Sequence, residues 1–469
     1  MKRGLILSVA AALVLGACSD QQEPSTTGPN SPEVAAGTAS GTVRINAMLN
    51  TEPNAKILAE LGTFGSSVEA IPQIKAVTMR AKASQLPAIR ALSYVVSANE
   101  DVEVKGSPVD AVAATDFVNG FSTWDQDAVD VTPGPGANNR SVTQKGTGVF
   151  IGVLDTGLLD TWRQYFPQER ISSTYAKSFT GSDNGSIAEQ PNKWEHDVNS
   201  HGTHVTSTIL GYSLRGTPIT GTAPLATVIP VKVLNQNGSG SSAAVARGMV
   251  YIADLKRGPL AGSPVVINMS LGGPSPDAVT EAAVNYATAA GVILVASAGN
   301  AGDRGMGWPG AYQKVISVAA SGWVGEWIGG GSWWNARDVP EDDATKFYIT
   351  DFSSRQKAGQ DLDVAAPGSW VVGPYQTQNG KTSYFFLGGT SMASPHVAGI
   401  VALMAQKRFE AGGTLTPAEA ETILTVTAIP LAPGCRTITG PSGATEEVCW
   451  LVDATGSGLA TADAALAGT

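Results

Sequence analysis

From residue 149 onward, continuous apolar runs alternate with segments of helical periodicity. The apolar runs are VFIGVL, TVIPVKVL, PVVINMSL, GVILVASA, VISVAAS and LDVAAPG. Segments such as SSAAVARGMVYIADL and DAVTEAAVNYATAA lie between them, with apolar residues three or four apart. Strands that are apolar on both faces are typical of a parallel sheet covered by helices on both sides. We therefore predict an α/β domain with a doubly wound, mostly parallel sheet.

Residues 41–106 show a different order of patterns. TVRINAML alternates like a strand, NAKILAELG repeats like a short helix, and VEAIPQIKAVTMRA alternates again. ASQLPAIRALSYV has helical spacing, and VVSANEDVEV reads as a last strand. The order βαββαβ predicts a small split sheet with both helices on one face, in front of a larger domain at 107–469. Residues 106–147 are rich in Gly, Pro and polar residues, which predicts a connector followed by irregular surface structure.

The first 40 residues carry signals for export and tethering. Residues 1–18 begin with two basic residues, continue with an apolar stretch too short to span a membrane, and end in Leu-Gly-Ala-Cys. This ending resembles the bacterial lipobox, so we predict a signal peptide and lipidation of Cys18. An ordinary signal peptide that happens to contain a cysteine is the alternative. Residues 19–40 have no aromatic residue and few large apolar ones, which predicts a flexible tether.

The overall composition is that of a globular protein, with 43% hydrophobic and 15% charged residues among 469. The formal net charge of −10 gives no electrostatic basis for binding nucleic acid or anionic lipid. We therefore predict no nucleic-acid partner, and we expect contact with a membrane only through the lipidated precursor.

Two further cysteines, Cys435 and Cys449, lie in a stretch that reads as rich in loops. An exported chain meets an oxidising compartment, in which such a pair usually closes, and we predict one disulfide between them. A zinc site needs about four ligands and these thiols have no histidine nearby, so metal binding is the weaker interpretation.

Polar residues at the ends of the apolar runs are the first candidates for a site, because ligands of such sheets bind beyond the carboxyl ends of the strands. Asp155 ends the run GVFIGVLD, and Gly157 allows the chain to turn there. An aspartate that merely begins a turn explains this stretch alone equally well. In NSHGTHV, His201 begins a segment of helical periodicity and is predicted to face a pocket.

The spacing of His201 and His204 also raises the question of zinc. Neither His-Glu-x-x-His nor an adjacent carboxylate is present, so we predict no metal ligand here. A capping or packed histidine fits His204 better than His201. His396 is interpreted as packed too, because it lies one turn into its own predicted helix.

Ser391 lies in the stretch LGGTSMASPHVAGI. Gly388 and Gly389 allow close approach of the backbone, and Ser391 opens a helix with apolar residues behind it. Unpaired N–H groups and the positive end of a helix dipole stabilise an oxyanion that forms nearby. Pro395 is unexpected one turn into a helix, because proline lacks the backbone N–H. The segment is suited to carry a nucleophile.

Three segments together resemble the triad segments of the subtilisin family. They are Asp155-Thr-Gly, His201-Gly-Thr-His-Val and Gly389-Thr-Ser-Met-Ala-Ser-Pro-His-Val-Ala-Gly, in that family's order of aspartate, histidine and serine. The resemblance covers residues 120–469, and residues 41–106 are similar in pattern to the family's inhibitory propeptide. It implies a serine endopeptidase in which Ser391 attacks the peptide carbonyl, His201 transfers the proton and Asp155 holds the imidazole.

The same resemblance implies further site residues. Asn300, at the end of VASAGN, matches the family's side-chain oxyanion donor, with the backbone N–H of Ser391 as its partner. Gly307 matches a wall of the main specificity pocket. The segments that resemble the peptide-pairing strands contain Gly238, Ser239 and Gly240, and Ser270, Leu271 and Gly272. Taken alone, Asn300 and Gly307 fit ordinary turns equally well.

Two segments depart from the family pattern. A loop after the catalytic histidine often ligates calcium in the family, but residues 213–219 contain no carboxylate or amide side chain. We expect no cofactor for the chemistry, and structural calcium has no support at this loop. Residues 322–350 form an insertion with four tryptophans. It is either a loop that contacts substrate or a partner, or a loop that packs on its own domain.

The expected protein is an exported monomeric protease, made as a self-inhibited precursor that cuts itself early in residues 106–147. Proteins or peptides are its expected substrates, its own propeptide is inhibitor and folding aid, and its mature domain is extracellular or periplasmic. An α/β-hydrolase esterase is disfavoured, because the chain lacks Gly-x-Ser-x-Gly around Ser391 and the order serine, acid, histidine. An inactive protease fold that only binds is the other alternative, and every named catalytic position being filled counts against it.

Overall fold

The computed structural model describes residues 41–114, 122–133, 140–179, 186–214, 217–329, 333–335, 338–340, 342–376 and 382–469. The predicted signal peptide, Cys18 and the tether lie outside these residues. Within the described part of the chain, no helix combines the length and the apolar character needed to cross a membrane.

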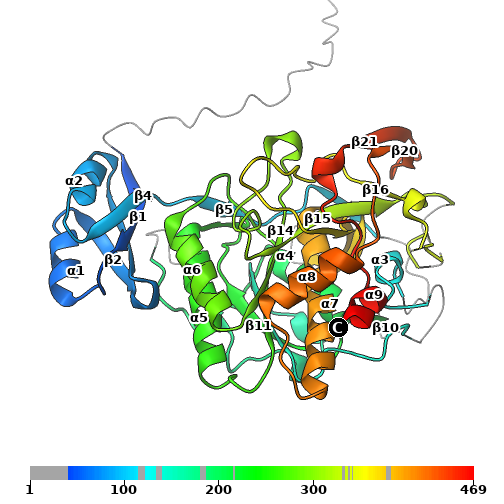
Figure 1. Ribbon diagram of the computed structural model, residues 1–469, viewed down its shortest axis with the longest axis horizontal. Helices are drawn as coiled ribbons and strands as arrows, with labels where there is room; N and C mark the ends of the chain where they lie inside the picture. Colours follow the sequence, from blue (N-terminus) through cyan, green and yellow to red (C-terminus); the bar gives the residue numbers. More distant parts are fainter. Residues whose placement is uncertain are drawn as a thin grey trace, which may run out of the picture.

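An eight-stranded sheet lies at the centre of the larger domain (Figure 1). Its order is β16-β15-β14-β13-β7-β11-β8, and β17 also pairs with β15. All pairs are parallel except β15 with β16. The strands are β7 (Phe150–Asp155), β8 (Lys177–Ser178), β11 (Thr227–Lys232), β13 (Val265–Met269), β14 (Ile293–Ser297), β15 (Ile316–Trp323), β16 (Phe347–Ile349) and β17 (Val364–Pro367). The predicted mostly parallel sheet is confirmed.

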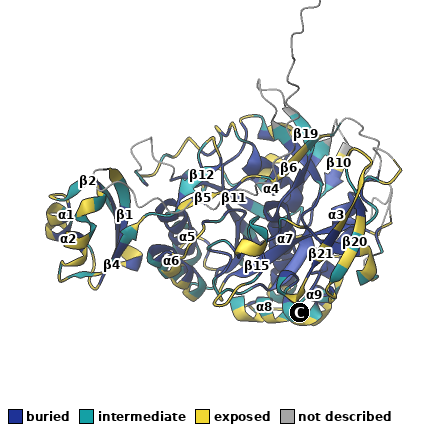
Figure 2. Ribbon diagram, turned by 90° about the horizontal axis from the view of Figure 1, so that it is seen from above, coloured by how far each residue is buried: buried dark blue, intermediate teal, exposed yellow. Residues whose placement is uncertain are grey.

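Helices cover both faces of this sheet, and Figure 2 shows the sheet and α7 as largely buried. Within β7, Ile151 and Val153 share one apolar core with α4 and α7, whereas Leu154 shares the other with α5 and α6. Neighbouring side chains of a strand point to opposite faces, so this strand has to be apolar throughout. The helices of this domain are α3 (Trp124–Ala128), α4 (His201–Leu210), α5 (Ser242–Arg257), α6 (Ala278–Ala289), α7 (Thr390–Glu410), α8 (Pro417–Thr427) and α9 (Ala462–Gly468).

Residues 42–100 form a separate antiparallel sheet beside α5 and α6 (Figure 1). The elements β1 (Thr42–Leu49), α1 (Ala55–Leu61), β2 (Gly65–Ile71), β3 (Ala76–Lys82), α2 (Leu86–Arg90) and β4 (Val95–Glu100) follow the predicted order βαββαβ. One contact of this sheet with the larger domain lies at the N-terminal ends of α5 and α6. Buried Asn46 donates through Nδ2 to Ser242 Oγ at the start of α5, at 3.0 Å, and to the α6 cap Asp277 Oδ2, at 3.2 Å.

Residues 103–114 connect the two domains as two short strands. β5 (Glu103–Lys105) pairs with β12 (Ser239–Ser241), and β6 (Asp110–Ala113) pairs with β19 (Thr382–Gly388). β19 also pairs with β18 (Val371–Gln376), so that β18, β19 and β6 form a small sheet of their own. A further hairpin consists of β9 (Gly211–Leu214) and β10 (Thr217–Thr220).

Residues 122–133 differ from the irregular surface structure predicted for this part of the chain. Trp124 and Ala128 of α3 are buried, and the Trp124 ring lies 6.2 Å from that of Trp333. The backbone N–H of Trp124 also donates to the backbone oxygen of Trp334, at 2.7 Å. This helix is too short for its periodicity to be recognised, and its burial depends on tryptophans some 200 residues further along the chain.

The predicted disulfide is present, although its surroundings are not the expected loops. β20 (Gly434–Thr439) and β21 (Thr445–Trp450) form an antiparallel hairpin in which Cys435 and Cys449 lie opposite each other. Their sulfurs are bonded at 2.05 Å. Both thiols are thereby used, so the nearby Glu447 does not complete a metal site with them.

Candidate active site

Asp155 and His201 meet at the carboxyl edge of the central sheet. Asp155 is the last residue of β7, and His201 is the first residue of α4. His201 Nδ1 lies 2.8 Å from Asp155 Oδ1, and neither side chain is exposed to solvent. A carboxylate on Nδ1 holds the proton on that nitrogen and leaves Nε2 as the basic atom of the ring.

Ser391 lies in the first turn of α7 and is almost completely buried. Its Oγ donates to Ser270 O at 3.2 Å, whereas His201 Nε2 has no hydrogen-bond partner within the described residues. Gly106 shows how close these groups are. A Cβ on Gly106 would lie 2.8 Å from Ser270 O and 3.3 Å from His201 Cε1. Ser270 O, which accepts from Ser391 Oγ, and the His201 imidazole therefore both lie next to Gly106.

A contact between Ser270 and Ser391 explains how α7 tolerates Pro395. In a regular helix the N–H of residue 395 would donate to Ser391 O, and proline has no N–H. Ser270 Oγ donates to that oxygen instead, at 2.8 Å, and α7 continues to Glu410. Asn268 Nδ2 donates in turn to Ser270 Oγ at 3.0 Å. The start of α7 is thereby tied to the strand end of β13.

Asn300 is held in one orientation by Thr390, the residue before Ser391. Asn300 Oδ1 accepts from Thr390 N at 2.9 Å and from Thr390 Oγ1 at 2.8 Å. With Oδ1 engaged, Nδ2 is the side that faces Gly389, 3.6 Å from the position of a Cβ there. Thr390 was not singled out from the sequence, although it stands inside the motif around Ser391, because its role depends on contact with a residue 90 positions away.

Asp197 organises the chain just before His201. It accepts from Thr156 Oγ1 at 2.8 Å and from Ser200 N at 2.8 Å, and Thr156 Oγ1 accepts from Gly202 N at 2.9 Å. Burial raises the pKa of Asp197, an effect opposed by the ammonium of Lys232 and by these donors. The network links the turn after Asp155 to the start of α4, and no short motif in the sequence reveals it.

The two histidines that are predicted to be packed, His204 and His396, are both buried. His204 Nε2 lies 3.1 Å from Val371 O, and burial lowers the pKa of His204 to about 3. His396 Nε2 lies 2.9 Å from Asp125 Oδ2 of α3, a partner that the sequence did not reveal. Among the described residues, the groups of side chains that could hold a metal ion include none of the histidines.

The predicted peptide-pairing segments bind the chain's own residues 103–106. Lys105 N donates to Gly272 O, and Gly272 N donates to Lys105 O, both at 2.9 Å. On the other side, Gly106 N donates to Gly238 O at 2.9 Å, and Ser239 and Gly240 pair with β5. An extended peptide between two antiparallel edges is held mainly by its backbone.

Leu271 and Gly307 take a less direct part than predicted. The Leu271 side chain is buried in the core beneath the cleft. A Cβ on Gly307 would lie 3.5 Å from Gly272 Cα, so Gly307 faces the back of the segment that pairs with Lys105. The bond between Trp308 and Pro309 is cis.

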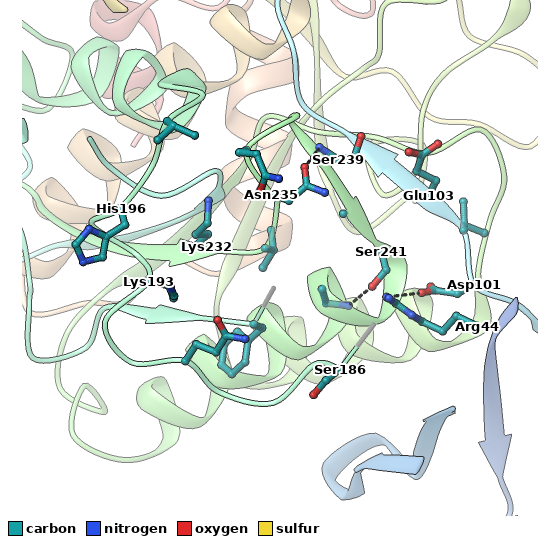
Figure 3. A pocket seen from close by; sticks show the side chains of 18 residues that line it. Arg44, Asp101, Glu103, Ser186, Lys193, His196, Lys232, Asn235, Ser239 and Ser241 are labelled. Atoms are coloured by element: carbon teal, nitrogen blue, oxygen red, sulfur yellow. Dashed lines mark hydrogen bonds and ion pairs between the residues drawn. The ribbon is translucent and has the colours of Figure 1, made fainter. Parts of the chain in front are cut away.

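A cavity of about 810 Å³ lies beside β12, between the two domains (Figure 3). Lys193, His196 and Lys232 line it on the side of the larger domain, and Arg44 and Asp101 line it on the other. Arg44 and Asp101 form an ion pair of 3.1 Å. The cavity borders the peptide-pairing strand, whereas the cleft itself is filled by residues 103–109.

Two places bear on cation binding. Residues 213–219, which have no carboxylate side chain, lie in the hairpin of β9 and β10. Elsewhere, Asp361, Asp363 and Glu421 bring carboxylate oxygens within 4.8 Å of one another. Burial raises the pKa of Asp363 to about 7, and Ser317 donates to it from N at 2.7 Å.

The tryptophan-rich insertion packs on its own domain. Trp323, Trp333 and Trp334 are buried, and Trp327 is half-buried. Glu326 is fully buried among them, where its Oε2 accepts from Tyr348 Oη and Ser369 Oγ at 2.8 Å. Burial raises the pKa of Glu326 to about 7. Packing on its own domain, one of the two interpretations of this segment, thus holds for its described tryptophans.

Comparisons with known proteins show the family of the chain. A sequence model of the Subtilase family matches residues 146–458. Thermitase of Thermoactinomyces vulgaris is 32% identical over 263 residues, which are 56% of this chain and 77% of that protein. Subtilisin Savinase of Lederbergia lenta is 34% identical over 58% of this chain and 81% of its own.

A solved structure extends the likeness in fold to most of the chain. Fervidolysin from Fervidobacterium pennivorans, described as a keratinolytic enzyme related to subtilisin, superposes with a TM-score of 0.62. The match covers 92% of this chain and 61% of that one at 23% identity, so it bears on fold alone.

Proposed function

The chain belongs to the subtilase family of serine endopeptidases, and from this premise we propose that Asp155, His201 and Ser391 are its catalytic triad. The observation that carries the proposal is the buried 2.8 Å contact of His201 Nδ1 with Asp155 Oδ1, at the point where an extended segment crosses the cleft. Proteins and peptides are the proposed substrates, because the cleft edges pair with a peptide backbone.

In the proposed reaction, the Ser391 hydroxyl turns from Ser270 O to His201 Nε2 and loses its proton as Oγ attacks the peptide carbonyl carbon. Asp155 stabilises the imidazolium that forms. Asn300 Nδ2 and the Ser391 N–H donate to the carbonyl oxygen as it becomes negative. His201 then gives the proton to the leaving amine, and a water molecule hydrolyses the ester by the same steps.

A fluorophosphonate probe tests this assignment on mature proteins, and the Ser391→Ala chain is first processed by a trace of tagged wild-type enzyme that is then removed. We expect covalent labelling and peptide hydrolysis by the wild type, and neither by Ser391→Ala. Ser442→Ala is the control, because Ser442 is exposed in the turn between β20 and β21 and has no contact with the triad. Unlabelled mature wild type without hydrolysis would instead support an inactive protease fold that only binds.

The proposed enzyme is made as a precursor in which residues 41–106 block the cleft. Support comes from Lys105 and Gly106, which occupy both pairing edges next to His201. The proposed self-cleavage falls between Gly106 and Val109, where the segment passes the triad. N-terminal sequencing of the mature form checks this, and the full-length Ser391→Ala chain should stay uncut when expressed alone. Normal processing of that variant would assign the cut to another protease.

Export and lipidation of Cys18 complete the proposal. After the cut, the lipid holds only the N-terminal piece, and the monomeric catalytic domain is released into the extracellular or periplasmic space. Metabolic labelling with a radioactive fatty acid should mark the precursor and not the mature enzyme, and Cys18→Ala should abolish the label. Labelled mature enzyme would contradict the release.

A further inference from the structure

The chain lies in the cleft as an extended strand on both sides of the triad. Beyond the stretch from Gly106 to Val109, Val109 N donates to Gly388 O at 2.7 Å, and Ala114 N donates to Tyr384 O at 2.9 Å. Between these two contacts, β6 pairs with β19 in regular antiparallel register. The edge of β19 thus extends beyond the triad, alongside the residues that follow the proposed cleavage site.

Backbone pairing provides most of the contact of β6 with this edge. Asp110, Ala111 and Ala113 are exposed, and only Val112 and Ala114 are half-buried. Main-chain hydrogen bonds of this kind tolerate many sequences, so another extended polypeptide can replace β6 on the same edge. A four-residue strand with little buried surface is also weakly held, which favours such an exchange.

An aromatic cluster supports one position on this edge. Val112 is paired with Phe386, so their side chains lie on the same face of the small sheet, and Val112 packs against the core that contains Phe386. The ring of Trp327 lies 5.0 Å from that of Phe386, and the ring of Trp333 lies 5.5 Å from it. The tryptophan-rich insertion therefore forms the base under the position of Val112.

Resting on the proposed function, we propose that the edge of β19 binds the part of a protein substrate that follows the scissile bond. In this proposal Phe386, backed by Trp327, selects an apolar residue at the place of Val112. Gly106 is paired to Gly238 and Val109 to Gly388, and the Ser107–Pro108 bond lies midway between Gly106 and Val109. Counted from this bond, Val112 is the fifth residue of the leaving part. The substrate class is an extended, unfolded polypeptide segment.

The test uses the mature enzyme and matched fluorescence-quenched peptides. Two peptides share all residues before the scissile bond, and one has two residues after it and the other six, with valine in fifth place. We expect kcat/KM to be at least about tenfold higher for the longer peptide, and to fall about tenfold when that valine is replaced by aspartate. Trp327→Ala should remove most of the preference for valine and leave cleavage of the short peptide unchanged.

Phe409→Ala is the matched control, because Phe409 is an exposed aromatic near the far end of α7. It should keep both the length dependence and the preference for valine. Equal kcat/KM for the short and long peptides would overturn this inference and would leave the proposed function intact. It would mean that the substrate does not replace β6 on the edge of β19. Failure to cleave any of the peptides would overturn the proposed function and this site with it. A Trp327→Ala variant that slows both peptides equally would also count against the site.

Discussion

Two buried pairs of histidine and aspartate lie in the same domain, and only one of them faces the cleft. His201 Nδ1 is 2.8 Å from Asp155 Oδ1, and His396 Nε2 is 2.9 Å from Asp125 Oδ2. The pairs differ at the other ring nitrogen. His396 Nδ1 lies 2.9 Å from Met392 O, whereas His201 Nε2 has no partner within the described chain.

The difference shows that a buried carboxylate–imidazole contact does not by itself mark a catalytic base. A base needs a nitrogen that is free to take a proton from the nucleophile. His396 uses Nε2 to join α7 to α3 and Nδ1 to contact Met392 O within α7, and is therefore part of a structural pair. Five substitutions test or sharpen this division between a catalytic and a structural pair.

The largest effect is expected from His201→Ala. Without the base, kcat should fall about 10⁶-fold, the size of the loss known for subtilisin. The change in the free energy of unfolding should be far smaller than the change in activation free energy that this loss represents. Each protein is first processed by a trace of tagged wild-type enzyme, which is then removed by its tag, and kcat is measured on one peptide. An equal loss of kcat in Asp125→Ala would abolish the distinction between the pairs.

Asn300→Ala should lower kcat about 10²- to 10³-fold with little change in KM, as found for the side-chain oxyanion donor of subtilisin. Thr390→Val should have a smaller effect in the same direction, since it removes the Oγ1 hydrogen bond to Asn300 and leaves that of the backbone. Steady-state kinetics on the processed proteins check both. A rise in KM alone would show that Asn300 acts in binding and not on the oxyanion.

Glu326→Gln extends the comparison of the two pairs to a buried carboxyl group whose partners are Tyr348 and Ser369 and not a histidine. Because burial raises the pKa of Glu326 from 4.5 to about 7, its protonated form is favoured in the folded protein. The stability that this group contributes is complete below about pH 4.5 and is lost as the pH rises through 7, by up to about 3 kcal/mol. In a Ser391→Ala background, the glutamine variant should gain stability over its parent from pH 5 to pH 8. Parallel curves of unfolding free energy against pH would contradict this.

Asp125→Ala should have the smallest effect, a loss of about 1–3 kcal/mol in the free energy of unfolding, because His396 Nε2 is left without its partner. The kcat of the folded, processed enzyme should stay at the wild-type value. Urea unfolding in a Ser391→Ala background gives the first quantity, and active-site titration followed by peptide hydrolysis gives the second.

Residues inside short continuous motifs could be predicted from the sequence. Asp155, His201, Ser391 and Asn300 stand at the ends or starts of predicted elements, and parallel strands bring such ends to one edge. Thr390 and Asp125 could not be assigned, since their roles depend on contacts with residues 90 and 271 positions away. The small sheet of β18, β19 and β6 was missed because short strands with mixed pattern resemble loops.

The sequence by itself determined the parallel α/β sheet, the βαββαβ unit before it and the disulfide of Cys435 with Cys449, because periodicity and cysteine spacing are local properties. Only the tertiary structure decided which histidine keeps a free nitrogen, what lies in the cleft and where the insertion packs. These depend on which distant side chains meet, and a local pattern does not encode such meetings. His201 and His396 each contact a buried aspartate, and their other neighbours give them different roles.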